Sequence, residues 1–186
     1  MYNRKYTPEM ITLLAGNEIF VFGSNLAGSH GGGAARLAYN RFGAIWGQGV
    51  GFQGQCYAIP TMHGGVDAIK PYVDEFISFT KLHPELIFLV TKIGCGIAGF
   101  KDEEIAPLFA AAIDVENIIL PKSFVCVIST AERYAAEMST MKFKTVRIKL
   151  FREDEEKLKL MTREEKNVFM QKIREEHRYT VIRDED

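Results

Sequence analysis

The sequence predicts an α/β fold: a mixed sheet with helices on both faces, followed by a charged α/β extension at the C-terminus. Strand-like and helix-like segments alternate up to residue 138, which is typical of a parallel or mixed sheet covered on both faces. All 16 glycines lie between Gly16 and Gly99, whereas more than half of the residues from Lys142 onward are charged. We therefore expect one α/β domain over residues 1–139 and the extension over residues 140–186.

The first part of the chain contains three expected elements. Residues 18–24, EIFVFGS, predict a short buried strand because aromatic and β-branched residues lead to a glycine. Residues 33–42 carry apolar side chains at helical spacing and end before Gly43, as a helix does. Residues 56–61, CYAIPT, predict a second strand that a proline closes.

The middle of the chain continues the alternation. Residues 66–83 place apolar side chains along one helical face, and residues 85–93 form the strongest strand pattern of the sequence. Residues 102–113 begin with three acids, which favour a helix N-terminus. Residues 124–129, FVCVIS, predict a further buried strand, and residues 130–138 predict the helix after it.

The C-terminal extension has its own elements. Residues 142–151 alternate apolar and basic side chains, as an edge strand does, and residues 178–186 begin with a short strand pattern. Residues 162–177 predict a helix, with Thr162 and Glu165 as a capping box. The extension either packs on the domain as a solvated segment or serves as a module that binds a partner or nucleic acid. Its mixed charges favour the first interpretation.

The bulk composition limits the class of protein. A net charge of −1 provides no global field to attract phosphates, which argues against a tail-like nucleic-acid binder. The cysteines Cys56, Cys95 and Cys126 are odd in number and far apart, as reduced thiols of a cytoplasmic protein would be. The N-terminal segment is too polar for a signal peptide, and no apolar run reaches membrane-spanning length. We therefore expect a cytoplasmic protein with no membrane contact.

Two glycine-rich segments follow predicted strands and lead into predicted helices. The first spans Gly23–Gly33, and the second, Gly94–Gly99, has the spacing G-x-G-x-x-G. Ligands of such sheets bind at the carboxyl ends of the strands, where glycine amides and helix N-termini attract anions. Two facing loops of this kind suit a diphosphate. A Rossmann dinucleotide site is not expected, because the fingerprint follows the fourth strand and no acid ends the next one.

The segments FVFGSNLAGSHGGGAARLA and FLVTKIGCGIAGFKDEEIAPLF together resemble the macrodomain family, in a divergent bacterial or phage-like branch. The resemblance covers roughly residues 18–138 and implies a three-layer fold that binds ADP-ribose. It implies that Asn25 meets the distal ribose, that the second loop closes over the diphosphate, and that Phe100 stacks near a ribose or the adenine. The ligand-binding residues it implies are Gly23, Ser24, Asn25, Gly31, Gly32, Gly33, Gly94, Cys95, Gly96, Ile97, Ala98, Gly99 and Phe100.

The chain also departs from the family pattern. IGCG is most similar to the branch that removes ADP-ribose from acidic side chains, but Ala98 stands where that branch has an aspartate. The lysine of that branch has no counterpart either, because IPTMHGG occupies its region. Covalent lysine chemistry is therefore not expected.

Few other side chains are candidates for chemistry. His30, in the first loop, either polarises a water or contacts phosphate as a catalytic partner of Asn25, or is an exposed polar residue. Cys95 is either a small filler of a tight loop or, at a helix N-terminus, an activated nucleophile. Trp46 is either a core residue or a platform for base stacking, and we expect it in the core. No spacing typical of a metal site occurs, so neither a metal nor a cofactor is expected.

Three function classes remain open. The first is a binder of ADP-ribose or a derivative, which recognises ADP-ribosylated protein or nucleic acid. The second is a hydrolase that removes ADP-ribose from a substrate or dephosphorylates ADP-ribose-1″-phosphate. The third is a nucleotide-dependent structural or phage-related role. The sequence shows no clear general base, which favours binding.

Overall fold

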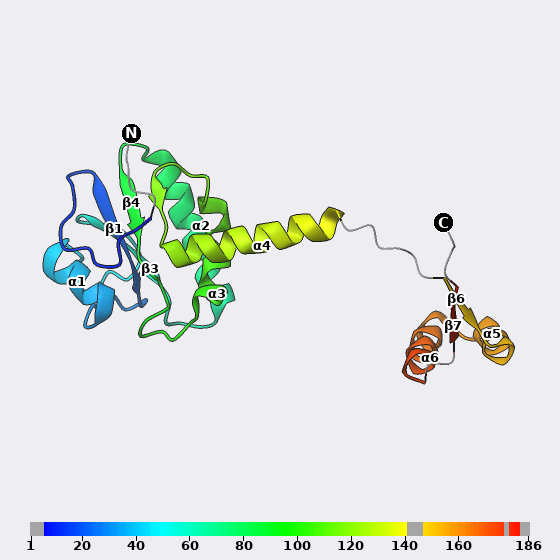
Figure 1. Ribbon diagram of the computed structural model, residues 1–186. Coiled ribbons are helices and arrows are strands. Elements are labelled where there is room, and N and C mark those ends of the chain that lie inside the picture. The colour runs from blue at the N-terminus through cyan, green and yellow to red at the C-terminus, as the bar shows by residue number, and fades with distance from the viewer. Residues whose placement is uncertain (1–5, 141–146, 177–178, 183–186) are drawn as a thin grey trace. The chain divides into compact units, whose positions relative to one another are not determined.

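The structure, a computed structural model, describes residues 6–140, 147–176 and 179–182. Its internal contacts divide the chain into two units, Met1–Met138 and Ser139–Asp186, next to the division expected from composition (Figure 1).

The first unit is built on a five-stranded sheet with the strand order β2-β3-β1-β4-β5. The central strand β1 pairs in parallel with β3 and with β4, β4 pairs in parallel with β5, and β2 pairs antiparallel with β3. The sheet is therefore mixed, as the sequence predicts. The strands are β1 Glu18–Ser24, β2 Gly51–Gln53, β3 Cys56–Pro60, β4 Ile87–Val90 and β5 Ile118–Ile119.

Strand β1 is buried on both of its faces, and its side chains alternate between two hydrophobic cores. Ile19 and Val21 belong to the first core. Phe20 and Phe22 belong to the second core. A central strand that is apolar on both faces needs cover on each side, and helices provide it.

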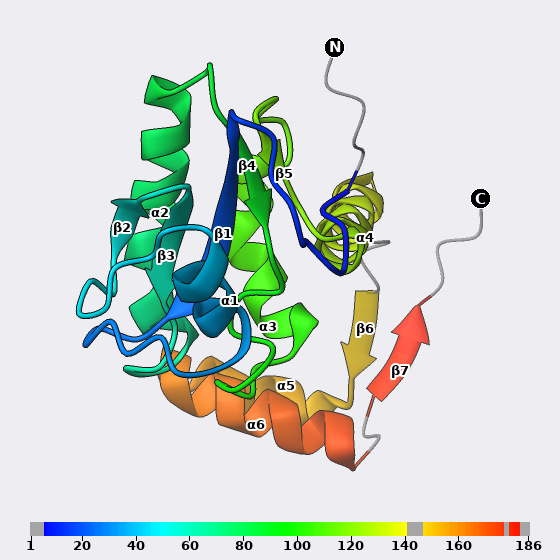
Figure 2. The ribbon, with the colours of Figure 1, turned by 90° about the vertical axis from the view of Figure 1, so that its left-hand side faces the viewer.

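Helices lie on both sides of the sheet, and Figure 2 shows α1 in front of it and α2 behind it. Helix α1 supplies Ala35 and Ala38 to the second core. Helix α2, the 3₁₀ helix η1 and helix α4 supply the first core with side chains such as Phe76, Phe109 and Phe124. These elements are α1 Gly33–Arg41, α2 Val66–Leu82, α3 Asp102–Ile105, η1 Ala106–Ala112 and α4 Lys122–Thr140.

The strand predicted at residues 124–129 is wrong, because this segment belongs to helix α4. Phe124 and Ile128 are buried, at 0% and 2% exposure, while Cys126 between them is exposed. In a strand all three side chains would share one face, whereas a helix puts only residues four apart together. The edge strand next to β4 is instead β5. Its two residues are too few to produce a recognisable strand pattern in the sequence.

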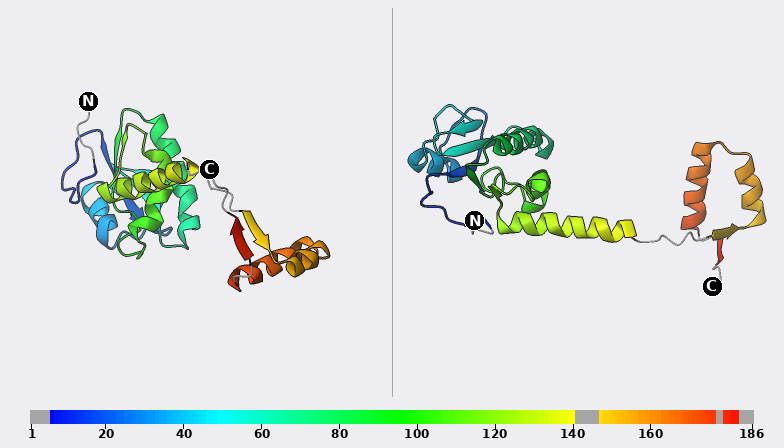
Figure 3. Two further views of the ribbon diagram at one scale, coloured as in Figure 1. Left: turned by 45° about the vertical axis from the view of Figure 1, so that its right-hand side comes forward. Right: turned by 90° about the horizontal axis from the view of Figure 1, so that it is seen from above.

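The second unit is a two-stranded antiparallel sheet whose strands enclose two helices along the chain (Figure 3). Thr162 and Glu165 form the predicted capping box: the Thr162 amide donates to Glu165 Oε2 over 2.8 Å, and the Glu165 amide donates to Thr162 Oγ1 over 3.4 Å. Helix α5 was not expected, because its charged sequence has no apolar stripe. Residues 142–146 and 183–186 of the predicted strands lie outside the described residues. The elements are β6 Arg147–Leu150, α5 Arg152–Lys159, α6 Arg163–Glu175 and β7 Tyr179–Ile182.

Of the helices in the described residues, none has the length and the apolar content that a membrane crossing requires.

The helical assignment of residues 124–129 has a measurable consequence. Phe124 is fully buried with its ring centroid 5.8 Å from that of Phe109. We expect Phe124→Ala to lower the free energy of unfolding by about 3–5 kcal/mol, because the truncation leaves a cavity in the first core. Cys126→Ala is the matched control and should change it by less than about 0.5 kcal/mol. Denaturant unfolding measures both values, and similar losses for the two variants would contradict the helical assignment.

Candidate ligand-binding cleft

Parallel pairing brings the two glycine-rich segments to the same edge of the sheet. Val21 of β1 lies opposite Val90 of β4, so both strands run toward this edge. Thr91, directly after β4, donates from its Oγ1 to the Val21 carbonyl over 2.9 Å and fixes the start of the second loop. Beyond β1, the Thr61 amide donates to the Ser24 carbonyl over 2.9 Å and ties the end of β3 to the start of the first loop.

The smaller cavity, of about 180 Å³, lies between the two glycine loops. Its walls come from the residues after β1, β3 and β4, the three adjacent parallel strands. Most of the residues that the macrodomain resemblance implies are therefore brought together. Those that line it are Gly23, Ser24, Asn25, Gly32, Gly33, Gly94, Gly96, Ile97 and Ala98.

The larger cavity, of about 830 Å³, adjoins the smaller one. The two share Gly33, Ala34, Thr91 and Lys92 as lining residues, so together they form one cleft. Segment 7–11 also lines the larger cavity, and Thr7 ties it to β5 by donating from its Oγ1 to the Ile119 carbonyl over 2.6 Å. The cleft thus extends from the glycine loops toward the start of α4.

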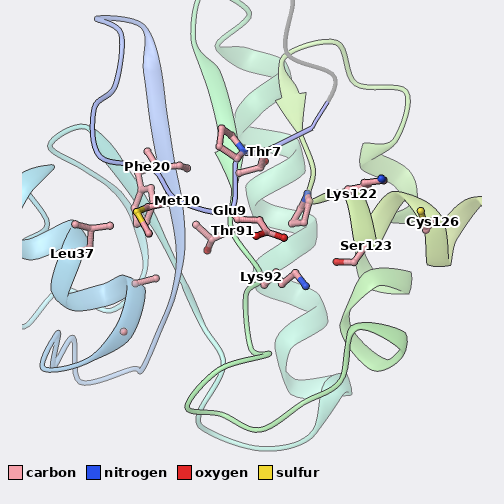
Figure 4. Close-up of a pocket in the computed structure, with 15 residues that line it drawn as sticks. Thr7, Glu9, Met10, Phe20, Leu37, Thr91, Lys92, Lys122, Ser123 and Cys126 are labelled. Carbon is pink, nitrogen blue, oxygen red and sulfur yellow. The ribbon is translucent and has the colours of Figure 1, made fainter.

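The two sides of the larger cavity differ in polarity (Figure 4). Met10, Phe20 and Leu37 form an apolar side near β1 and α1. Polar groups come from the other side, where Glu9 and Lys122 line the cavity. A flat ring with polar edges suits such an environment, because the apolar side chains contact its face while the polar groups can pair with its edge.

Backbone amides are available on both sides of the smaller cavity. Among the described residues, the amides of Gly96, Ile97 and Ala98 donate no hydrogen bond. Gly33 begins helix α1, whose first-turn amides have no acceptor within the helix. Amides and a helix N-terminus that face one cavity form a favourable environment for an anion.

Asn25 lies where the first loop begins, and its amide is oriented by two hydrogen bonds within the loop. Its Nδ2 donates to the Ser29 carbonyl over 2.9 Å, and its Oδ1 accepts from the Ser29 amide over 3.0 Å. An asparagine amide has a second donor and a second lone pair. Asn25 can therefore hold the loop and still offer one donor and one acceptor to a diol in the smaller cavity.

His30 is buried, at 1% exposure, and is neither the exposed residue nor the cavity residue that the sequence left as alternatives. Its Nε2 lies 3.1 Å from the carbonyl oxygens of Ile45 and of Gln48. Because both neighbours are acceptors, Nε2 carries the proton and donates to them. His30 does not line either cavity, so its geometry supports a structural role in the loop rather than a catalytic one.

The remaining implied residues lie away from the smaller cavity. Gly31 and Gly99 are exposed and do not line it. Phe100 is half-buried and packs on the first core, so it does not offer its ring to either cavity.

Cys95 packs against the first core as well, and it does not line the smaller cavity. Burial, reinforced by a hydrogen bond to Asp102 and by the charge of Asp102, raises the pKa of the Cys95 thiol to about 12. A thiol of this kind is protonated at neutral pH, which disfavours a nucleophile and favours the filler interpretation.

Three charged residues that line the cleft, Glu9, Lys92 and Lys122, were missed from the sequence. Lys92 lines both cavities, and its Nζ lies 3.3 Å from Asp102 Oδ2. Burial raises the pKa of Asp102, but the nearby polar groups of Ser123 and Cys95 and the positive charge of Lys92 outweigh this effect and hold the pKa below its usual value. Asp102 is therefore an anion beside the lysine at neutral pH. Glu9 lies in a segment with no recognisable motif.

The described residues contain no group of three or more His, Cys, Asp or Glu side chains that could hold a metal ion. Comparison with protein-family models, with curated proteins and with solved structures finds no match to this chain.

The three cysteines should differ in their reactivity. Cys126 is exposed and lines the larger cavity, whereas burial raises the pKa values of Cys56 and Cys95 to about 12. We expect a thiol reagent to modify Cys126 first in the folded protein, and a ligand that fills the larger cavity to slow this step. Mass spectrometry of the labelled peptides measures the order. Cys126→Ser should remove the rapid first step of thiol labelling. A rapid step that persists in this variant would show that another cysteine reacts first.

Proposed function

We propose that this chain is a macrodomain-like protein that binds ADP-ribose or a close derivative in the cleft. The observation that carries the proposal is that two glycine loops face each other across a cavity that adjoins a larger, amphipathic one. The diphosphate lies between the loops, where the amides of Gly96, Ile97 and Ala98 have no other acceptor. The distal ribose lies beside Asn25, and the adenosine occupies the larger cavity.

The polarity of the cleft supports this orientation of the ligand. The apolar side formed by Met10, Phe20 and Leu37 provides contact area for a purine ring, and Glu9 provides an acceptor for its polar edge. Lys92 lies where the two cavities meet and can donate a hydrogen bond to the diphosphate, although Asp102 already balances its charge. A nucleoside monophosphate could use only part of this set, because it lacks the second phosphate and the distal ribose that would reach Asn25.

The side chains near the proposed distal ribose favour a binding role over hydrolysis. Among the described residues that line the smaller cavity, none carries a carboxylate or an imidazole that could act as a general base. Such a site can hold the ligand without reacting with it, as a module that recognises ADP-ribosylated protein or nucleic acid would. The hydrolase remains the second candidate because Asn25 could orient a water at the ribose.

Gly96 provides the main test of ligand placement. Its backbone is not in the left-handed region, and a Cβ at this position meets nothing within 4 Å, so Gly96→Val should fold. Gly96 lines the smaller cavity, so a valine side chain there would take up space beside the proposed diphosphate. We expect ADP-ribose to bind the wild type at least about ten times more tightly than AMP, and Gly96→Val to remove at least about tenfold, or 1.4 kcal/mol, of the ADP-ribose affinity. Isothermal titration calorimetry measures both differences.

Gly65→Val is the matched control for this test. Gly65 also has open space at its Cβ and an extended backbone, with φ of −78° and ψ of −173°, and it lines neither cavity. This variant should bind ADP-ribose as the wild type does. Equal affinities for ADP-ribose and AMP, or full affinity in Gly96→Val, would overturn the proposal.

Asn25→Ala separates binding from hydrolysis. In a hydrolase this variant should lower turnover of an ADP-ribosylated substrate more than it weakens binding, because Asn25 would act in the transition state. In a binder it costs affinity alone, about 0.5–1.5 kcal/mol for a lost hydrogen bond. Because Asn25 also holds Ser29, thermal unfolding of the variant is measured alongside. Turnover that is unchanged in this variant would exclude Asn25 from catalysis.

A further inference from the structure

Two aromatic side chains form an exposed pair next to helix α1. Trp46 is 56% exposed and Tyr39 is 46% exposed. The prediction that Trp46 lies in the core is therefore wrong. Their ring centroids lie 5.6 Å apart with an interplanar angle of 72°. Neither residue lines the cleft, so the pair is a separate feature of the surface.

Hydrogen bonds from the buried His30 hold the loop that carries Trp46 in place. The Nε2 of His30 donates to the carbonyls of Ile45 and Gln48, which flank the tryptophan on both sides in the chain. The Gly47 amide donates to the Gly28 carbonyl over 3.0 Å, which ties this loop to the first glycine loop. An exposed aromatic ring on a loop held in this way is already oriented for contact, which lowers the entropic cost of binding a ligand.

The chain around this pair has no negative charge of its own. Residues 19–66 contain no Asp or Glu, and their only Lys or Arg residues are Arg36 and Arg41. Both arginines are exposed on α1, and Arg36 lies three residues before Tyr39, on the same side of the helix. Neither arginine forms an ion pair among the described residues. The surface therefore combines exposed rings with an available cation.

We propose that Tyr39 and Trp46, together with Arg36, form a binding site for single-stranded nucleic acid. The aromatic faces stack with unpaired bases of any sequence, and the guanidinium group contacts the phosphates. An apolar patch of a protein partner would cover the rings but leave Arg36 without a counter-charge, so charge complementarity favours a polyanion. The proposal does not depend on ADP-ribose binding, because the site lies outside the cleft.

Trp46 gives the test a direct signal because it is the only tryptophan of the chain. The full-length protein is titrated at low salt with an oligothymidylate of roughly ten nucleotides, a length within the usual range of single-strand sites. We expect saturable quenching of the tryptophan fluorescence. A blunt duplex of the same length should quench much less, since its bases are stacked on one another and not free to stack on a side chain.

Variants assign the contacts, measured by the anisotropy of a labelled oligothymidylate. Trp46→Ala and Tyr39→Ala should each weaken binding by about fivefold or more, as the loss of a stacked base does. Arg36→Gln should reduce the slope of log affinity against log salt by about 0.7, the value for one phosphate contact on a single strand. The matched controls are Tyr134→Ala, an exposed aromatic on α4, and Lys81→Gln, an exposed cation on α2, and both should bind as the wild type does.

Several results would overturn this site. They are the absence of quenching at low salt, equal quenching by the duplex, and wild-type affinity in both aromatic variants. Sedimentation of the free protein tests the other occupants of the surface: a dimer that Trp46→Ala dissociates would show that a second copy of the chain covers the pair. Trp46→Ala should bind ADP-ribose as the wild type does, because Trp46 lines neither cavity. This result separates a failure of the nucleic-acid site from a failure of the cleft.

Discussion

The parallel pairing of β1 with its two neighbours is the constraint on which the cleft depends. The register Val21↔Val90 and Ser24↔Pro60 brings the ends of three strands to one edge, although the loops that follow are far apart in the chain. An antiparallel β4 would carry its glycine loop to the opposite edge of the sheet. Because parallel strands require burial on both faces, the two hydrophobic cores and their helices are a condition for the cleft as well as for stability.

The first glycine loop packs closely against the backbone of residues 47–49, and glycines at the contact points make this close approach possible. Gly28 has a φ of +63°, and a Cβ at this position would overlap the backbone of Gln48. A Cβ at Gly49 would likewise overlap the Asn25 and Leu26 carbonyls. These close backbone contacts and the hydrogen bonds of the buried His30 hold the first glycine loop, which lines the cleft, against the loop that carries Trp46. The same contacts therefore support both of the sites proposed for this chain.

The sequence predicted those parts of the fold that depend on local periodicity. Strand β1, helices α1 and α2 and the edge where the glycine loops meet follow from patterns of apolar residues and glycine. The strand at 124–129 was wrong because a run such as FVCVIS fits a buried strand and a buried helix equally well over so short a length. The burial of His30 and the exposure of Trp46 depend on contacts between residues 28–30 and 45–48, which no local pattern encodes.

Electrostatics distinguishes how the two proposed sites would attract anions. In the cleft, the one lysine shared by both cavities already faces Asp102, and this half-exposed pair contributes little net attraction in water. Recognition of a diphosphate there must come mainly from neutral amides at fixed positions, whose effect depends on geometry and on exclusion of water. At the surface formed by Tyr39, Trp46 and Arg36, the arginine forms no ion pair among the described residues, and the two rings contact each other while each stays about half exposed. Affinity there depends on charge and stacking, which tolerate many sequences, whereas affinity in the cleft depends on the shape of a single ligand.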